Sequence, residues 1–160
     1  MTDIVDASTR SWMMSGIKSK NTRHEIEIRK RLFALGFRYR LHDSRLPGKP
    51  DIIFPSYKAV IFIHGCFWHA HDCDLFKWPS SRVKFWRKKL NRNREKDNDS
   101  NNALKKLGWR ISTVWECSFR GPGKKREEEI DAIVRKIVKW LHSGKRHLEI
   151  RGRIRKNVII

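Results

Sequence analysis

Apolar residues recur along this chain at spacings that alternate between those of helices and those of strands. Residues 21–37 (NTRHEIEIRKRLFALGF) place Thr22 and Glu25 at the spacing of a capping box, and Gly36 follows the last periodic residue. This segment is predicted to be a helix with its apolar positions at 26, 28, 32, 33 and 35. Residues 126–144 predict an amphipathic helix whose inward positions are Ile130, Ile133, Val134, Ile137, Val138 and Leu141.

Between these helices lie the segments with strand character. The segment FRYRLHD is strand-like, LPGKP is a turn, and DIIF and KAVIFIHG are predicted to form a hairpin whose second strand is buried on both faces. Residues 81–107 predict a long charged helix that ends at Gly108, and WRISTVWEC predicts another buried strand. This order of elements predicts an α/β sandwich around a mixed central sheet.

The length of the chain limits it to one compact domain with tails. Its 160 residues are 39% hydrophobic, enough for one core. The predicted division is an N-terminal arm over residues 1–20, a domain over 21–144 and a basic, mobile C-terminal tail over 145–160. The arm carries the apolar run WMM, which needs a partner outside the core.

The charge of the chain points to a polyanionic partner. Lys and Arg number 37 against 17 Asp and Glu, a formal net charge of +20, and nucleic acid is the first candidate. An anionic membrane is the alternative, but the longest strongly apolar run is only AVIFI. Asp3 and Asp6 occupy the place of an apolar signal segment, so a cytoplasmic protein without a membrane partner is expected.

The stretch HGCFWHAHDC, residues 64–73, concentrates potential metal ligands. Cys66, His71 and Cys73 are close in sequence, and Cys117 follows the last buried strand, from where it could come alongside. Three thiolates and one imidazole make a closed tetrahedral set suited to a structural zinc ion. Buried free thiols with a satisfied histidine are the alternative. His69 competes with His71 as the ligand, and spacing alone does not choose between them.

Candidate catalytic groups surround the predicted hairpin. Asp51 stands where its first strand begins, and many nucleases hold Mg²⁺ near a scissile phosphate with such a carboxylate. Turn chemistry is the ordinary explanation of Asp51, and capping of the first helix is the ordinary explanation of Glu25. His64 and His69 could be structural, yet histidine can also activate water. Together these residues suggest metal-assisted phosphodiester hydrolysis.

Four segments closely resemble the very short patch repair endonucleases, in the same order: TRSWMMSGIKSKNT, LPGKPDIIF, VIFIHGCFWHAHDC and LGWRISTVWECSFRG. The resemblance runs from about Ala7 to Gly121, and the HGCFWH-x-H-x-C block is highly specific. It implies a restriction-endonuclease-like fold, a variant of the PD-(D/E)xK superfamily. It also implies a monomeric, nucleoid-associated prokaryotic enzyme that nicks double-stranded DNA 5′ to the mispaired thymine of a T:G mismatch, left by deamination of 5-methylcytosine, with repair proteins as further partners.

The resemblance assigns catalytic roles to particular residues. Asp51 matches the metal-binding aspartate, the backbone carbonyl of residue 63 is a second Mg²⁺ ligand, and His69 is the general base. Glu25 matches an assisting carboxylate, and His64 lies beside the scissile phosphate. The family often has Thr at position 63, and the change to Ile63 is expected to be tolerated because the ligand is a carbonyl. By the same resemblance, His71 is the zinc ligand, alongside Cys66, Cys73 and Cys117.

Aromatic and basic residues are expected at the DNA. By resemblance, Phe67, Trp68 and Trp86 enter the duplex from the major groove as a wedge, and the arm with Met14 enters from the minor groove. Packing around the zinc loop is the alternative for the aromatic residues. Residues 82–96 carry eight basic side chains against one acid, so phosphate contacts are favoured over a merely solvated face. Contacts with DNA are expected from Lys89, Arg92 and Asn93.

The sequence therefore predicts a Mg²⁺-dependent, mismatch-directed, strand-specific nicking endonuclease with a structural zinc ion. One rival is a duplex-cleaving restriction-type enzyme, which would cut both strands and usually needs a dimer. The other is a zinc-stabilised mismatch-binding module without catalysis. The combination of Asp51, Glu25, His64 and His69 speaks against the second rival, because a mere binder has no need of carboxylates facing phosphate.

Overall fold

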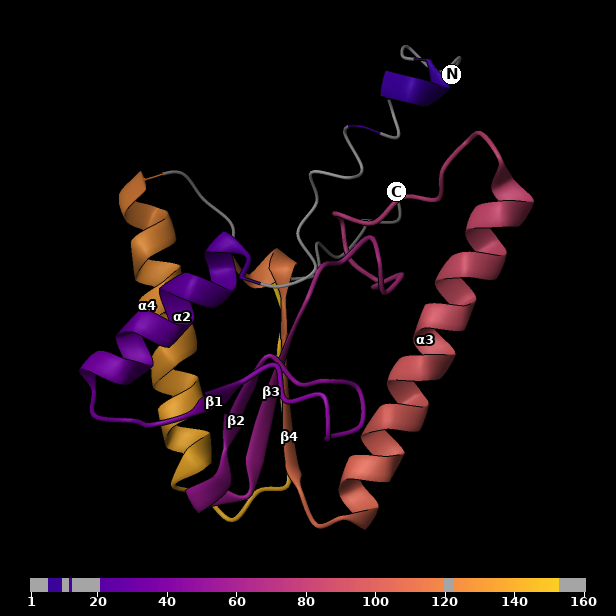
Figure 1. Ribbon diagram of the computed structural model, residues 1–160. Coiled ribbons are helices and arrows are strands. Elements are labelled where there is room, and N and C mark those ends of the chain that lie inside the picture. The colour runs from indigo at the N-terminus through magenta and orange to yellow at the C-terminus, as the bar shows by residue number, and fades with distance from the viewer. Residues whose placement is uncertain (1–5, 10–11, 13–20, 120–122, 153–160) are drawn as a thin grey trace, which may run out of the picture.

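A mixed five-stranded sheet forms the centre of the molecule (Figure 1). The computed structural model describes residues 6–9, 12, 21–119 and 123–152. Strand β2 pairs antiparallel with both β1 and β3, and β3, β4 and β5 run parallel. The sheet order follows the chain: β1 (Arg40–Leu41), β2 (Ile52–Phe54), β3 (Ala59–His64), β4 (Arg110–Trp115) and β5 (His147–Ile150). The predicted hairpin and the predicted mixed α/β sheet are confirmed.

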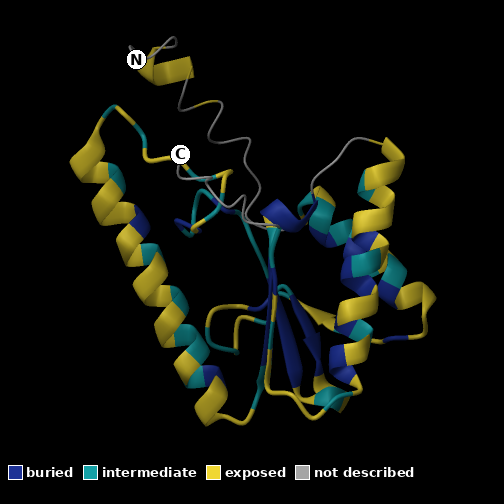
Figure 2. Ribbon diagram, turned by 180° about the vertical axis from the view of Figure 1, so that it is seen from behind, coloured by how far each residue is buried: buried dark blue, intermediate teal, exposed yellow. Residues whose placement is uncertain are grey.

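Helices cover both faces of this sheet. Helices α2 (Arg23–Ala34) and α4 (Gly123–Leu141) lie together on one face, and α3 (Val83–Lys106) lies on the other (Figure 1). Alternate residues of β3 point to opposite faces, so Ile61 joins the α2 and α4 core while Val60 packs on the α3 side with Leu104. Figure 2 shows the strands buried between helices whose outer surfaces are exposed. As predicted, β3 is buried on both faces over its first four residues.

The first helix begins and ends close to its predicted bounds. Thr22 is its N-cap, and its hydroxyl accepts a hydrogen bond of 3.3 Å from the backbone N–H of Glu25. Only Ile28 and Leu32 of its five apolar positions are in the core, because Ile26 is half-buried and Phe33 and Leu35 are exposed. They lie outside the stripe, centred on Ile28 and Leu32, that packs against the neighbouring elements. In α4, Val138 is only partly buried.

The expectation of a mobile tail from residue 145 is wrong for its first part. Residues His147–Ile150 form β5, which pairs in parallel with β4 from Ile111 to Val114. Ile150 is buried in the main core, so the sheet extends beyond the predicted domain end at residue 144. This edge strand has only four residues, and two of them are exposed, so its alternation of polar and apolar residues is too short to indicate a strand. The strand was therefore not predicted.

Some predictions fall outside the described part of the chain. Met14 lies there, as do most of the predicted N-terminal arm and residues 153–160. Within the described residues, no helix combines the length and the apolar character needed to cross a membrane.

Candidate active site and metal centre

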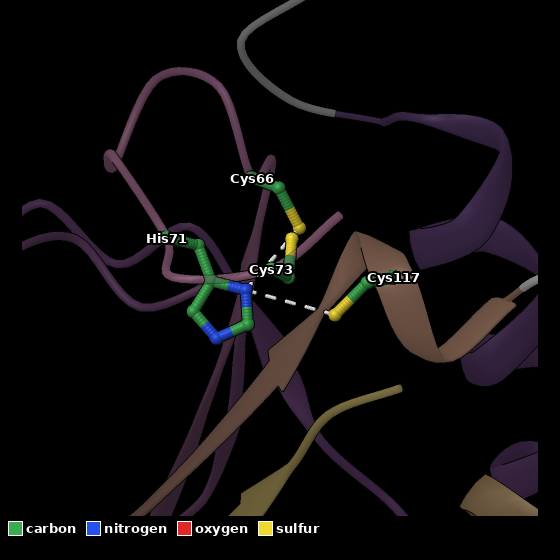
Figure 3. A group of neighbouring side chains, drawn as sticks. All are labelled: Cys66, His71, Cys73 and Cys117. Atoms are coloured by element: carbon green, nitrogen blue, oxygen red, sulfur yellow. Dashed lines mark hydrogen bonds between the residues drawn. The ribbon is translucent and has the colours of Figure 1, made fainter. Parts of the chain in front are cut away.

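The Cys and His residues of the HGCFWHAHDC stretch gather beyond the ends of two parallel strands. Cys66 follows β3, and Cys117 lies in the short helix η2 (Glu116–Phe119), which follows β4. Because His64 pairs with Trp115 in the sheet register, the two cysteines leave their strands at the same level. The loop after β3 then returns His71 and Cys73 to the same point, as Figure 3 shows.

The distances in this cluster suit a single tetrahedral ion. The Nδ1 atom of His71 lies 3.5 Å from Sγ of Cys66 and 3.6 Å from Sγ of Cys117 (Figure 3). An ion about 2.3 Å from sulfur and about 2.0 Å from nitrogen, with tetrahedral angles, separates such ligand atoms by about 3.5 Å. All four ligand atoms lie within 4.8 Å of one another. The separations of His71 from Cys66 and Cys117 therefore match those of ligands that share one metal ion.

Neighbouring groups hold the ligands in place. The backbone N–H of Gly152 donates to Sγ of Cys117 at 3.2 Å, and a side chain at Gly152 would collide with the Cys117 backbone. Trp115 stacks on His71 with ring centroids 3.8 Å apart. Burial raises the pKa of the Cys66 and Cys117 thiols, which makes their thiolate forms unfavourable unless a cation accompanies them. Trp115 at the end of β4 thus orients His71, and Gly152 after β5 orients Cys117.

A second group lies at the end of β3 and contains both histidines that the resemblance makes catalytic. His64 is the last residue of β3, and its ring stacks on that of His69 at 3.8 Å. Nδ1 of His69 lies 2.5 Å from Oδ2 of Asp97, a residue of α3. Burial, with His69 next to it, lowers the pKa of His64 to about 3, so its imidazole is neutral at pH 7. These residues line a pocket of about 420 Å³, together with Arg94, Asn101 and Trp115.

The third group contains Asp51 and Glu25. Asp51 precedes β2, and its Oδ2 accepts a hydrogen bond of 2.7 Å from the backbone N–H of Ile63 in β3. Burial raises the pKa of Asp51 to about 7, and the nearby Glu25 carboxylate adds to the rise. His42 lies between these two acids and was not singled out from the sequence. Asp51 and His64 thus stand at one end of β3, because Ile63 and His64 are adjacent.

The aromatic residues predicted to form a wedge contact one another. The ring of Phe67 lies edge-on to those of Trp68 and Trp86, with centroids 5.2 and 5.3 Å away. Nδ2 of Asn93 donates to the backbone oxygen of Trp68 at 3.0 Å, and Nζ of Lys89 lies 5.4 Å from the Trp68 ring. The loop after β3 therefore rests on the N-terminal half of α3, and the aromatic cluster is only half-buried there.

The same helix carries most of the predicted phosphate contacts. Seven of the eight predicted basic residues are in α3 itself, and Arg82 is its N-cap. Arg92 and Lys89 are exposed, and within the described part of the chain none of the eight pairs with an acid in a salt bridge. A basic strip with the aromatic cluster beside it thus borders the histidine pocket.

Some site residues gave no signal in the sequence. His42 follows a two-residue strand, and only the fold brings it to Glu25 and Asp51. Glu116 accepts a hydrogen bond of 3.1 Å from the backbone N–H of Cys66, although the residues are 50 positions apart. The structure groups His71 with the three cysteines and His69 with His64, a division that spacing left open.

Comparison with known proteins identifies the family. The family model of the DNA mismatch endonuclease Vsr matches residues 2–75. The type II nicking enzyme V.XorIIP of Xanthomonas oryzae pv. oryzae is 44% identical over 123 residues, which cover 77% of this chain and 90% of that protein. The DNA mismatch endonuclease Vsr of Escherichia coli is 40% identical over 141 residues, 88% of each chain. The type II nicking enzyme V.NmeAIP of Neisseria meningitidis is 44% identical over 137 residues, 86% of this chain and 97% of that protein. The chain therefore belongs to the Vsr family of DNA mismatch endonucleases.

Proposed function

We propose that this enzyme nicks one strand of duplex DNA, hydrolysing the phosphodiester 5′ to the mispaired thymine of a T:G mismatch. The observation that carries the proposal is that two groups stand at the same end of β3, one at Ile63 and one at His64. The carboxylate of Asp51 is tied to the backbone of Ile63, and the adjacent His64 stacks on His69. A mostly buried carboxylate that could bind a cation and a histidine that could accept a proton thus lie at the same end of β3.

In this proposal Asp51 binds the catalytic Mg²⁺ ion together with the backbone carbonyl of Ile63. The free Oδ1 atom of Asp51 is the side-chain ligand, because Oδ2 is taken by the Ile63 N–H. Bound there, the ion would polarise the phosphate and stabilise the leaving oxygen. Oxygen ligands and the raised pKa of Asp51 suit a hard divalent cation, which would displace the proton. Glu25 supports this acid from α2, and His64 contacts the scissile phosphate.

His69 takes the proton of the attacking water. The contact between Nδ1 of His69 and Oδ2 of Asp97 favours the tautomer whose proton is on Nδ1, so the lone pair is on Nε2. That nitrogen is then available as the general base. The neutral His64 beside it would not add a positive charge that opposes protonation of His69.

Replacing His69 with Ala is expected to lower the nicking rate by roughly 10² to 10⁴, the usual contribution of a general base. Asp97→Asn should produce a smaller loss. His69 can still reach the attacking water in this variant, but Asp97 no longer holds the proton of His69 on Nδ1. Single-turnover nicking assays on a T:G duplex measure both effects. Asp99→Asn is the matched control, since Asp99 is an exposed acid on the same helix. Near-normal nicking by His69→Ala at neutral pH would contradict its assignment as the base.

The aromatic cluster and the basic strip are proposed to bind the duplex. Phe67, Trp68 and Trp86 insert from the major groove as a wedge, which is easier at a mismatch because the base step there is already weakened. Arg92 and Lys89 contact phosphates, and Asn93 holds the loop that carries Trp68. Met14 of the arm is proposed to enter from the minor groove.

Trp68→Ala is expected to weaken binding of a T:G duplex by roughly ten-fold or more, since a stacked aromatic contributes about 1 to 3 kcal/mol. Binding of the fully paired duplex should change less, because the wedge inserts mainly at the mismatch. Fluorescence anisotropy with both duplexes measures the two affinities. Trp78→Ala, which removes an exposed tryptophan outside the Phe67, Trp68 and Trp86 cluster, is the control. Equal weakening on both duplexes would indicate that Trp68 only packs within the protein or adds affinity for DNA of any sequence.

The remaining parts of the proposal concern fold and assembly. The β2–β3 hairpin with Asp51 at its start, in a mixed sheet between helices, is the arrangement expected of a restriction-endonuclease-like fold of the PD-(D/E)xK type. The Cys66, His71, Cys73 and Cys117 cluster would hold a structural zinc ion, since its four ligands leave no open position. We propose that the enzyme acts as a monomer, because a single-strand nick requires one active site.

A strand-resolved assay tests the function. Duplexes identical except for T:G, T:A or C:G at one position, with randomised flanks, are incubated with Mg²⁺ or EDTA. The proposal predicts a Mg²⁺-dependent nick only in the thymine strand of the T:G duplex. Cleavage of both strands of the paired duplexes would favour a restriction-type enzyme. Tight mismatch binding without any nick would favour a non-catalytic module.

A further inference from the structure

His42 is held in an uncommon backbone conformation next to the proposed catalytic acid. Its φ is +48°, in the left-handed region that residues other than Gly rarely adopt, and its N–H donates to the backbone oxygen of Asp51 at 3.4 Å. The side chain is mostly buried between Glu25 and Asp51. Such strain persists where the surrounding structure enforces it, often at functional sites.

Glu25 fixes one nitrogen of the His42 ring. Nε2 of His42 lies 2.8 Å from Oε1 of Glu25, although the pair is not aligned as a regular hydrogen bond. A lone pair on Nε2 would repel a carboxylate oxygen at this distance, so the proton of the neutral ring belongs on Nε2. Glu25 itself is 1% exposed, and its oxygens also contact Arg29 and the backbone N–H of Asn21. Glu25 is therefore committed to positioning His42 and has little freedom to bind an ion directly.

The other nitrogen of His42 faces Asp51. Nδ1 lies 3.7 Å from Oδ1 of Asp51, the carboxylate oxygen that the Ile63 N–H leaves free. The separation is too long for a hydrogen bond. Two ligand atoms on one cation, each about 2.1 Å from it, lie about 3.0 to 3.6 Å apart for angles of 90 to 120°. A lone pair on Nδ1 and the free oxygen of Asp51 are thus nearly placed to share an ion.

We propose that Nδ1 of His42 is a further ligand of the catalytic cation at Asp51, held in place by Glu25, and that it shifts the preference of the site from Mg²⁺ toward Mn²⁺ or Co²⁺. The inference rests on the proposed function, which places the cation at Asp51. Metal-binding histidines commonly direct their second ring nitrogen at a carboxylate, and Nε2 of His42 faces Glu25 at 2.8 Å. Imidazole suits transition metals, whereas Mg²⁺ prefers oxygen ligands alone.

The test is pulsed electron paramagnetic resonance of Mn²⁺ bound to the zinc-loaded enzyme in complex with the nicked product duplex, which cannot turn over. The wild type should show ¹⁴N coupling from a directly bound imidazole. His42→Gln should lose this coupling and bind Mn²⁺ about ten-fold more weakly, with a smaller change for Mg²⁺. His42→Asn is a second variant, because Asn tolerates positive φ. His147→Gln, which removes an exposed histidine on β5, should behave as the wild type.

Controls separate this inference from the proposed function. Asp51→Asn should abolish the specific Mn²⁺ binding. A ¹⁴N coupling that persists in both His42 variants, or equal losses for Mn²⁺ and Mg²⁺, would overturn the inference, as would the absence of Mn²⁺ binding that depends on Asp51. Nicking of the T:G duplex by the wild type with Mg²⁺ is measured in parallel. This assay tests the proposed function independently of the role of His42.

Discussion

Asp51→Asn is expected to abolish nicking and, at the same time, to stabilise the magnesium-free protein above pH 7. The loss of activity should reach roughly three orders of magnitude, because a metal ion supplies several kcal/mol of transition-state stabilisation and each 1.4 kcal/mol is about ten-fold in rate. Single-turnover nicking of a T:G duplex measures this effect. Retained Mg²⁺-dependent nicking would contradict the assignment of Asp51.

The stability gain follows from the raised pKa of Asp51, about 7 in the folded protein against 3.8 for the unperturbed acid. The folded state then binds a proton more tightly than the unfolded state, so ionisation destabilises the fold increasingly from about pH 4 to pH 7. Asn cannot ionise, and the thermal midpoint of Asp51→Asn should therefore exceed that of the wild type most at pH 8 and least near pH 4. Thermal melts without added Mg²⁺, with zinc retained, measure the difference.

Asp43→Asn provides a control of opposite sign. Asp43 lies in the loop after β1, and its hydrogen bonds with Arg45 lower its pKa to about 2. Its ionised form is favoured in the folded state, so Asp43→Asn should not stabilise the protein at pH 8. It should also leave nicking unchanged. A Tm gain at pH 8 in both variants would show that removal of negative charge in general, rather than the burial of Asp51, is responsible.

Disruption of the zinc site proposed at the cysteine cluster is expected to have the second largest effect. Cys117→Ser should lower the zinc content well below one ion per chain and lower Tm by about 10 °C or more, because a structural zinc site contributes several kcal/mol to folding. The cluster joins the loop after β3 to η2, and Cys117 also binds the backbone of Gly152 after β5. Elemental analysis and thermal melts measure the two quantities.

Chelation of the wild type separates metal loss from damage by the substitution. A strong chelator should bring the wild-type Tm close to that of Cys117→Ser and should hardly change the variant. Readdition of zinc should restore the wild type only. One zinc ion per chain in Cys117→Ser, with an unchanged Tm, would show that Cys117 is not a ligand.

Strong periodicity explains why most of the fold could be predicted from the sequence. The buried strands β3 and β4 and the amphipathic α4 carry patterns that depend on few other elements. The strand β5 escaped prediction because only Ile150 of its four residues is buried, and its position depends on β4 being in place. The exposure of Phe33 likewise follows from where α4 lies, which no local pattern specifies.

The candidate site could be predicted only where its members share a motif or a register. Cys66 and Cys117 follow adjacent parallel strands, so their meeting follows from the predicted sheet. The contact of His69 with Asp97 spans 28 positions, and that of His42 with Glu25 joins a loop to a helix. Side chains that meet through tertiary packing leave no spacing in the sequence by which to find them.

The most direct test of the central claim is mass spectrometry of the products formed from a T:G duplex in ¹⁸O-labelled water with Mg²⁺. Hydrolysis by an activated water predicts a single break in the thymine strand, with a 5′-phosphate on the fragment that begins with the mispaired thymine and one ¹⁸O atom in that phosphate. The G strand should remain intact. Breaks in both strands, a break at another linkage, or a thymine strand that stays whole would contradict the account.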